Sequence, residues 1–401
     1  MLKKTLSKHK KTSLRKHKHK NKKRRSRKKS KHNTKRKKTE TPIKILFVTT
    51  IMTDKAIKEK EGEYIDFSYY TKHPKAFGLC SEDVDVYITE PNSSIPNGWR
   101  FGYKHEIKST DQLLLKFRKN VISKKFTDKA LKAFRKQSKV LHDNRGASGG
   151  LLDSNKLPNY VAKHVSPGRF RTKFIRKSDN QKSQTLTSNL APSNIVGFYD
   201  KPDRNFVDSP PCRLTAFTRD HPSLWKDSLP FIKRCDRLFK KLIPKRYKKQ
   251  KNKADKINTF RIDDTAFTTL TINYSWRTGC HKDSGDLDEG FGNLVVIEDD
   301  DNPHSYEGCY LGFPQYGVCV DVRQGDFLAM NVHEWHCNTE FIDLGGDTSN
   351  IKPNILKNKW YFNRLSLVLY LRKKMLRCKG LKTNKKTPSM SRLKLKQSRS
   401  K

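Results

Sequence analysis

Short apolar runs follow one another closely between residues 257 and 372. They read NTFRID, FTTLTINYSW, NLVVIED, CYLGFP, VCVDV, DFLAMN and RLSLVLYLR, and Gly, Pro and Asp residues separate them. Runs of this length that are bounded by turn residues are typical of strands. Because no segment with helical spacing intervenes, the pattern predicts a barrel or a jelly roll.

Helical spacing of apolar residues appears in three earlier segments. Residues 112–126 and 128–142 carry Lys and Arg opposite their apolar positions, and such a face either contacts nucleic acid or is merely solvated. Residues 221–247 form the third segment, whose apolar stripe we expect to buttress a sheet. This stripe comprises Trp225, Leu229, Ile232, Phe239 and Leu242.

The remaining segments before residue 257 mix strand-like and irregular patterns. IKILFVTTIM, EYIDFSYY and DVDVYIT read as strands, and so do NIVGFYD and CRLTAFT further along. Residues 144–184 combine Gly, Pro, Ser and basic residues, which predicts an irregular segment of the kind that contacts a substrate. Strands and helices that occur in separate runs place the chain in the α+β class.

Charge is concentrated at the two ends of the chain. The formal net charge is +47, and residues 1–40 hold 21 Lys and Arg against the single acid Glu40. From Arg372 to the end there are 13 basic residues and no acid. Tails of this composition are expected to be disordered and to bind polyanions by releasing counterions. Nucleic acid is the expected partner, and an import address or a solubilising tail are the alternatives.

Cysteine spacing and hydropathy restrict the cellular compartments in which the chain is expected. The eight cysteines show no C-x-x-C pair, and no apolar run reaches the roughly 18–20 residues of a membrane span. The first residues lack the apolar stretch of a secretory signal. We therefore expect no membrane association and an intracellular, reducing location. The nucleus or another DNA-containing compartment is expected if the source is eukaryotic or viral.

Two candidate metal ligands stand two positions apart directly after a predicted strand. His281 and Asp283 lie in RTGCHKDSGD, which is either a turn or half of a metal site. Downstream, NVHEWHCNTEF supplies His333 and His336 after another strand. Two His and one carboxylate form the facial triad that leaves positions open on Fe(II). Structural zinc held with Cys280, Cys309 or Cys337 is the weaker alternative, because such sites use tighter Cys/His spacing.

A cation opens the strongly apolar run RLSLVLYLR. Arg364 is costly to bury without a carboxylate, which either belongs to a structural Asp or Glu or comes from an anionic co-substrate. Its planar guanidinium suits a bidentate carboxylate. Ser366 stands two residues further on and faces the same side of an extended strand.

These motifs resemble the base-J-binding-protein/TET family. The resemblance covers roughly residues 193–375, and its most specific parts are N-Y-x-x-R-T-x-x-H-x-D and F-P-Q-Y-G-V-x-V-D. It implies a double-stranded β-helix (jelly roll) core with buttressing helices. It also implies an Fe(II)- and 2-oxoglutarate-dependent dioxygenase that uses O₂ to oxidise the 5-methyl group of thymine or 5-methylcytosine in nucleic acid.

The resemblance also implies roles for single residues. His281, Asp283 and His336 would bind iron, and His336 is preferred to His333 because H-C-N-T resembles the family's H-G-N-T. Arg364 would bind the distal carboxylate of 2-oxoglutarate with Ser366 beside it. No catalytic residue is expected beyond the metal centre. Asn273 and Arg277 match two further family positions, where they would touch co-substrate or substrate or have a structural role. His333 is a weaker substrate candidate.

Two departures leave rival functions open. The segment between His336 and Arg364 is longer than the family pattern, and residues 1–190 match no recognised pattern. One rival keeps the iron chemistry but hydroxylates RNA or a protein side chain. The other is a catalytically inactive, basic nucleic-acid-binding protein.

Together these patterns divide the chain into four regions. We expect a basic disordered tail over 1–42, a mixed accessory region over 43–192, the dioxygenase domain over 193–375 and a basic tail over 376–401. The oligomeric state is not predicted.

Overall fold

The described helices and strands all lie within residues 42–401. The computed structural model describes residues 47–48, 53–65, 69–70, 79–80, 83–88, 99–101, 111–142, 145–150, 160–164, 172–181, 190–202, 211–302 and 304–378. The N-terminal tail predicted over 1–42 lies outside these residues, and so does the C-terminal tail beyond residue 378.

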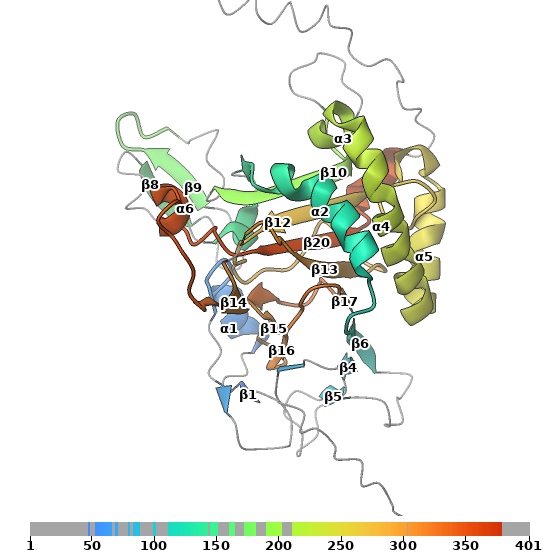
Figure 1. Ribbon diagram of the computed structural model, residues 1–401, viewed down its shortest axis with the longest axis horizontal. Helices are drawn as coiled ribbons and strands as arrows, with labels where there is room; N and C mark the ends of the chain where they lie inside the picture. Colours follow the sequence, from blue (N-terminus) through green and yellow to red (C-terminus); the bar gives the residue numbers. More distant parts are fainter. Residues whose placement is uncertain are drawn as a thin grey trace, which may run out of the picture. The chain divides into compact units, whose positions relative to one another are not determined.

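A large antiparallel sheet runs through these residues (Figure 1). Ten strands form it, in the order β11-β10-β12-β20-β13-β17-β6-β4-β5, with β7 paired to β10. Strands distant in sequence therefore lie side by side, as β12 and β20 do. The strands are β4 (Val84–Ile88), β5 (Trp99–Phe101), β6 (Gln112–Arg118), β7 (Leu141–His142), β10 (Ala191–Tyr199), β11 (Arg213–Leu214), β12 (Thr269–Tyr274), β13 (Gly292–Glu298), β17 (Phe327–Met330) and β20 (Arg364–Tyr370).

A smaller sheet packs against the large one. Its order is β18 (Cys337–Asn338), β15 (Leu311–Phe313), β16 (Val318–Val320) and β3 (Leu79–Cys80), and only the β16–β3 pair is parallel. Apolar side chains of both sheets form one buried cluster, which includes Leu294 and Leu328 from the large sheet and Val318 from the small one. The two sheets thus enclose a core between them.

Helices cover the outer face of the large sheet. Figure 1 shows α2 (Lys124–Ser138), α4 (Pro222–Leu242) and α5 (Pro244–Asp255) along one side of it. The predicted apolar stripe of residues 221–247 is confirmed, since Ile232 and Phe239 are buried in the core under this layer. The chain breaks into two helices at Pro244, which starts α5 because proline has no N–H for the preceding helix. The mixed α/β class with antiparallel sheets is confirmed.

Three predicted elements are wrong. Residues 112–118 form β6 rather than a helix, because three consecutive leucines carry no period that separates the two structures. Residues 258–260 form a 3₁₀ turn rather than a strand. The irregular segment 144–184 contains the antiparallel pair β8 (Tyr160–His164) and β9 (Thr172–Arg176).

Three further helices and two further strand pairs are described. The insertion between His336 and Arg364 holds β19 (Phe341–Asp343), which pairs with β14 (Tyr306–Gly308), and α6 (Pro353–Lys357). Near the start of the described residues lie the pair β1 (Phe47–Val48) and β2 (Tyr69–Tyr70) and the short helix α1 (Asp54–Glu59). CRLTAFT, predicted as a strand, contains β11 and the start of α3 (Ala216–Asp220).

The region predicted as accessory contributes to both sheets. β6 pairs with β17 of the large sheet, and β3 pairs with β16 of the small one. The described strands on either side of residue 193 therefore share one structure. The boundary between regions 43–192 and 193–375 stays a prediction.

Two observations concern the cysteines and the helices, and the compartment itself stays a prediction. Cys212 and Cys378 form a disulfide, whereas the cysteine pattern led us to expect reduced thiols. The two cysteines are 166 residues apart in sequence, so local spacing could not predict their pairing. Of the helices that the structure describes, none combines the length and the apolar character needed to cross a bilayer.

We predict that Phe239→Ala lowers the free energy of unfolding by about 3–5 kcal/mol, because it opens a cavity under the helices. Phe239 is fully buried, with its ring stacked 6.0 Å from Phe267 and edge-on to Tyr247. Urea denaturation measures the change. Leu344→Ala, at a residue that is 54% exposed, is the control and should change it by less than about 0.5 kcal/mol. Equal losses in both variants would contradict this account of the core.

Candidate active site

Two histidines from distant segments are held side by side by their backbones. The N–H of His281 donates to the carbonyl of His336, and the N–H of His336 donates to the carbonyl of His281, each at 3.0 Å. These two residues form an isolated antiparallel bridge between the loop after β12 and the start of β18. Their rings lie 4.3 Å apart, so both imidazoles reach the same point in space.

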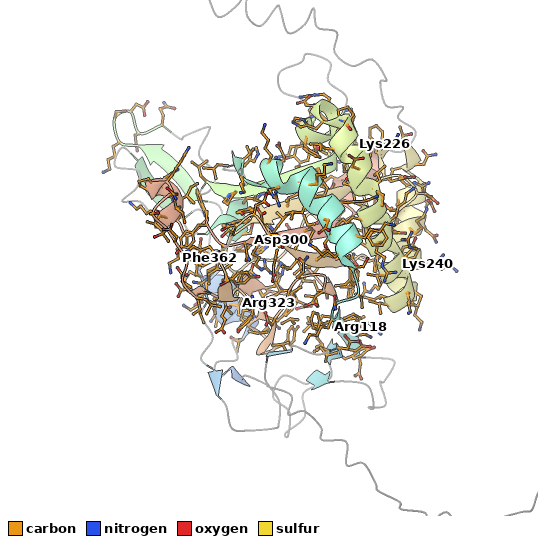
Figure 2. The ribbon with its side chains drawn as sticks, viewed as in Figure 1. Arg118, Lys226, Lys240, Asp300, Arg323 and Phe362 are labelled. Atoms are coloured by element: carbon orange, nitrogen blue, oxygen red, sulfur yellow. A yellow bond between two sulfur atoms is a disulfide. The ribbon has the colours of Figure 1, made fainter. Side chains whose placement is uncertain are left out.

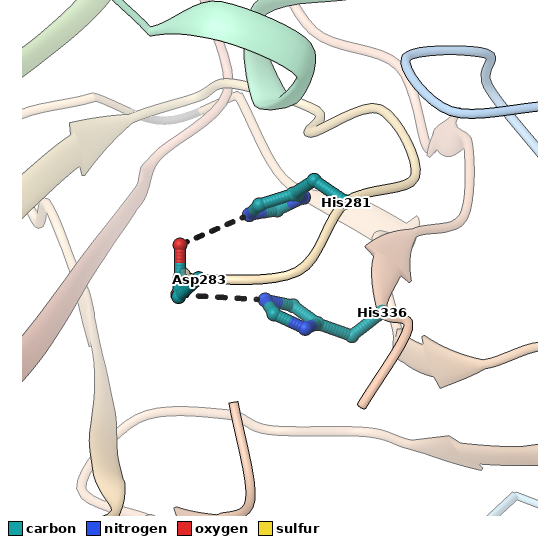
Figure 3. Close-up of side chains that lie close together, drawn as sticks. All are labelled: His281, Asp283 and His336. Atoms are coloured by element: carbon teal, nitrogen blue, oxygen red, sulfur yellow. Dashed lines mark ion pairs between the residues drawn. The ribbon is translucent and has the colours of Figure 1, made fainter. Parts of the chain in front are cut away.

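Asp283 completes a three-residue cluster (Figure 3). One carboxylate oxygen lies 3.6 Å from Nε2 of His281 and the other 3.7 Å from Nε2 of His336. The backbone N–H of Asp283 donates to the Val332 carbonyl at 2.9 Å, which fixes the loop. The ligand atoms of all three residues lie within 4.8 Å of one another. They are arranged as the predicted triad requires.

The imidazoles are oriented by their second nitrogens. Nδ1 of His281 lies 2.7 Å from the Gly279 carbonyl, and Nδ1 of His336 lies 2.9 Å from the Glu334 carbonyl. Each Nδ1–H therefore donates to backbone, which leaves Nε2 free to bind a metal. Burial and the neighbouring His281 lower the pKa of His336 to about 4. His336 is thus neutral at pH 7, which is the form that binds metal.

The other predicted ligands lie elsewhere. His333 is outside the cluster, and its Nε2 lies 3.1 Å from the carbonyl of Leu287. The buried thiols of Cys280, Cys309 and Cys337 are not part of the cluster either. Within the described residues, His281, Asp283 and His336 are the one group of three or more side chains able to hold a metal ion.

A cavity of about 400 Å³ connects this cluster to the predicted co-substrate residues. Arg364 and Ser366 line it from β20, and Asn273 lines it from β12, directly across from Ser366. Arg364 is only 3% exposed, and its Nε has no hydrogen-bond partner among the described residues. Such a buried donor favours an anionic ligand over a structural role.

Two of these neighbours have structural contacts. Ser193 donates a hydrogen bond from its hydroxyl to the side-chain oxygen of Asn273. Arg277, also predicted near the site, is absent from the cavity wall: it donates to the Asn338 carbonyl at 3.0 Å, and its guanidinium lies over the ring of Tyr64 at 4.8 Å. In this structure Arg277 fixes the wall behind the site.

One part of the cavity wall lies in the segment 144–184 that was predicted to contact a substrate, but its individual residues were not identified from the sequence. Arg145 and residues 146–148, from the predicted accessory region, line the cavity beside the metal cluster. The Ser148 carbonyl accepts from the Gly279 N–H at 3.1 Å. A Cβ at Gly279 would come within 2.6 Å of the Gly62 carbonyl oxygen, so only glycine allows this approach. The glycine-rich stretch RGASGG was the available signal.

A second missed group lies on β20 and just beyond it. Tyr370 and Arg372 continue the two-residue alternation of Arg364, Ser366 and Val368 and line the same cavity. Arg372 donates to a carboxylate oxygen of Asp200 at 2.7 Å. The strand period could have identified both residues.

A family model matches the part of the chain that contains this site. Residues 194–373 match the Tet_JBP model, described as the oxygenase domain of the 2OGFeDO superfamily. This part of the chain is similar to the Tet/JBP oxygenase family. The family comprises Fe(II)- and 2-oxoglutarate-dependent dioxygenases, and the predicted resemblance and cofactors are confirmed. The two imidazoles, the carboxylate and the buried guanidinium fit the metal and the co-substrate of a Tet/JBP domain.

Several curated proteins are similar to this chain over half of its length or more. Thymine dioxygenase JBP1-B of Trypanosoma cruzi (strain CL Brener) is 32% identical over 241 residues, which are 58% of this chain and 25% of that protein. Thymine dioxygenase JBP1 of Trypanosoma brucei brucei is 32% identical over 234 residues, again 58% and 25%. The protein of the same name from Crithidia fasciculata is 30% identical, over 51% of this chain and 24% of that protein. The chain spans about a quarter of the length of these relatives.

Two solved structures overlap loosely with the chain. One is titled NgTET1 in complex with 5mC DNA, with a TM-score of 0.37, 13% identity, and coverage of 71% of this chain and 81% of that chain. The other is OsALKBH1, with a TM-score of 0.28, 13% identity, and coverage of 64% and 96%. TM-scores this low do not establish a shared fold.

We predict that His336→Ala weakens Fe(II) binding on the order of 100-fold or more, because it removes one of three ligands. Anaerobic titration calorimetry measures the dissociation constant. His333→Ala is the matched control and should bind Fe(II) like the natural chain. The reverse ranking of the two variants would identify His333 as the ligand.

We also predict that Arg364→Lys raises the dissociation constant for 2-oxoglutarate about tenfold to a hundredfold, because an ammonium cannot match the bidentate guanidinium. The measurement is a 2-oxoglutarate titration of the Fe(II)-loaded protein under nitrogen. Arg377→Lys, at an exposed position, serves as the control. Unchanged affinity in Arg364→Lys would assign the co-substrate to another cation.

Proposed function

We propose that this chain is a dioxygenase that hydroxylates the 5-methyl group of a nucleobase in DNA, thymine in the first place and 5-methylcytosine as the alternative base. The observation that carries this proposal is the cavity that the His281–Asp283–His336 cluster shares with the buried guanidinium of Arg364, whose Nε has no hydrogen-bond partner among the described residues. Thymine is favoured because the curated relatives are thymine dioxygenases by name. The two Trypanosoma relatives are 32% identical to this chain over 25% of their own length.

We propose further that the core is a jelly roll, which is the fold expected for this assignment. After β12 the chain passes to the His281 bridge on the side of the small sheet, then to β13, to β15 and β16, to β17, to β18 and finally to β20. It thus alternates between the two sheets, as expected of a double-stranded β-helix. Such a core brings ligands from facing strands to one open end.

The residues of the site have separate tasks in this proposal. His281, Asp283 and His336 would hold Fe(II) on one face, and Arg364 with Ser366 would orient 2-oxoglutarate through its distal carboxylate. Iron and co-substrate together supply the O₂-dependent oxidation of a C–H bond. The protein positions the target methyl group and excludes water from the cavity.

The far end of the cavity would receive the base. Tyr370 lies six residues beyond Arg364 on β20, about 20 Å along an extended strand. Its ring and the guanidinium of Arg372 offer a stacking surface and hydrogen-bond donors. A thymine methyl group lies in the major groove, so a duplex substrate requires the base to be flipped into this cavity.

The remaining assignments follow from a DNA substrate. We propose that the basic tails contact the nucleic-acid backbone without specifying sequence. Residues 43–192 would act as an accessory region and 193–375 as the dioxygenase domain, although their strands share the sheets. An intracellular, DNA-containing compartment is the expected location.

The proposal predicts a gain of one oxygen atom on the target base. Purified protein would be incubated with Fe(II), ascorbate, 2-oxoglutarate and either thymine DNA or 5-methylcytosine DNA, followed by mass spectrometry of the nucleosides. His281→Ala should abolish the product. His221→Ala, which changes an exposed histidine at the start of α4, should retain it.

The other outcomes reassign the function. Turnover of 2-oxoglutarate to succinate without product on either base would move the substrate to RNA or protein. Neither turnover nor product would favour an inactive nucleic-acid-binding protein.

A further inference from the structure

Helix α2 presents a row of lysines to solvent. Lys125, Lys129, Lys132 and Lys136 are all exposed and follow one another at spacings of four, three and four residues. This spacing places them on one face of the helix. The buried residues of α2, among them Phe134, occupy the opposite face.

Helix α4 packs beside α2 and presents a second row. Lys226, Lys233, Arg237 and Lys240 are exposed at spacings of seven, four and three residues, opposite the buried face of α4. Figure 2 shows Lys226 and Lys240 toward the two ends of this helix. We call the two rows together the basic face.

The basic face is not neutralised by the described part of the chain. Lys233 pairs with Asp263 at 2.7 Å, and no ion pair with a described residue is found for the other seven. Nearby acids pair with other cations: Asp128 binds Lys124, and Asp299 binds Arg135. Like charges at these spacings destabilise a helix, so a merely solvated face would gain from mixed signs. A polyanion would neutralise both rows at once.

The dimensions of the basic face suit a nucleic-acid backbone. The α2 row extends about 16 Å and the α4 row about 21 Å, at about 1.5 Å per residue. Packed helix axes lie about 8–10 Å apart. A nucleic-acid strand carries one phosphate per roughly 3.4 Å of axis, so each row meets several phosphates.

A membrane surface suits the basic face less well. Peripheral helices insert exposed apolar side chains between their basic residues. The exposed large apolar residues found among the described residues include none from α2 or α4. Phosphate groups of nucleic acid are therefore the better match for lysines without apolar neighbours.

The basic face is separate from the cavity. Alternate residues of β12 point to opposite sides of the large sheet: Asn273 lines the cavity, whereas Ile272 belongs to the core under the helices. The helices thus cover the side of the sheet that faces away from the cavity. A ligand on the basic face would not occupy the active site.

We propose that the basic face is a second binding surface for the backbone of a long nucleic acid. This inference rests on the proposed function only for the identity of the substrate. It binds without reading sequence, because lysines that contact phosphates carry no base information. Long substrate remains bound through this surface while the cavity is empty.

The test compares two fourfold variants of the full chain. Lys125, Lys129, Lys132 and Lys136 are changed to Gln in the first, and four exposed lysines elsewhere (Lys55, Lys58, Lys357 and Lys374) are changed to Gln in the control. Affinity for a fluorescent 30-base-pair duplex is measured across a salt series. We expect the affinity of the first variant to fall at least about tenfold. The slope of log K against log salt should become about 3–4 smaller in magnitude, and both changes should be much smaller in the control. Thermal melting checks that both variants fold.

Other results would overturn the proposal. Equal losses in both variants would reduce it to an effect of net charge, and unchanged binding would remove it. Binding to phosphatidylserine vesicles that falls in the first variant, without any loss of duplex binding, would assign the face to a membrane. Because the assay measures binding, a loss of duplex affinity supports the basic face even if nucleoside analysis finds no oxidation and the proposed function fails.

Discussion

The reciprocal backbone pairing of His281 with His336 is the constraint on which the site depends. It joins two segments that lie far apart in the sequence. Cys280, which precedes His281, is paired with the N-terminal region: its N–H donates to the Glu63 carbonyl, and its carbonyl accepts from the Gly62 N–H, both at 2.8 Å. The ligand segment is therefore held between the small-sheet segment and the N-terminal region. The arrangement of the candidate ligands and the adjoining cavity wall both depend on this short ladder.

Patterns local to the sequence predicted most of the site. Two histidines and an aspartate at strand ends, and an arginine at the start of an apolar strand, are chemically unusual enough to stand out. The strands β12, β13, β17 and β20 were also found, because they are flanked by clear turn residues. In contrast, QLLLKFR was assigned to a helix: an apolar run without alternation becomes β6 only through its pairing with the distant strand β17, which no local pattern records.

The missed residues share a physical reason. Arg145 reaches the cavity because a glycine-rich turn packs on Gly279. The pairing of Cys212 with Cys378 joins residues that are 166 apart in the sequence. Both contacts form only when segments distant in sequence come together in the fold. Arg277 shows the opposite case. Its motif indicated a place in the site, but the fold uses its guanidinium to hold a carbonyl and an aromatic ring behind the wall.

Neighbouring residues of strand β20 face two different environments. Leu365, Leu367 and Leu369 face the core under the helices, whereas Arg364, Ser366 and Tyr370 face the cavity. A substitution at Tyr370 therefore changes the cavity face without removing a leucine from the buried face or altering Arg364 at the opposite end of the strand. Under the proposed function, a single replacement at the Tyr370 end alters the preference among bases, while Arg364 at the other end still binds the same co-substrate.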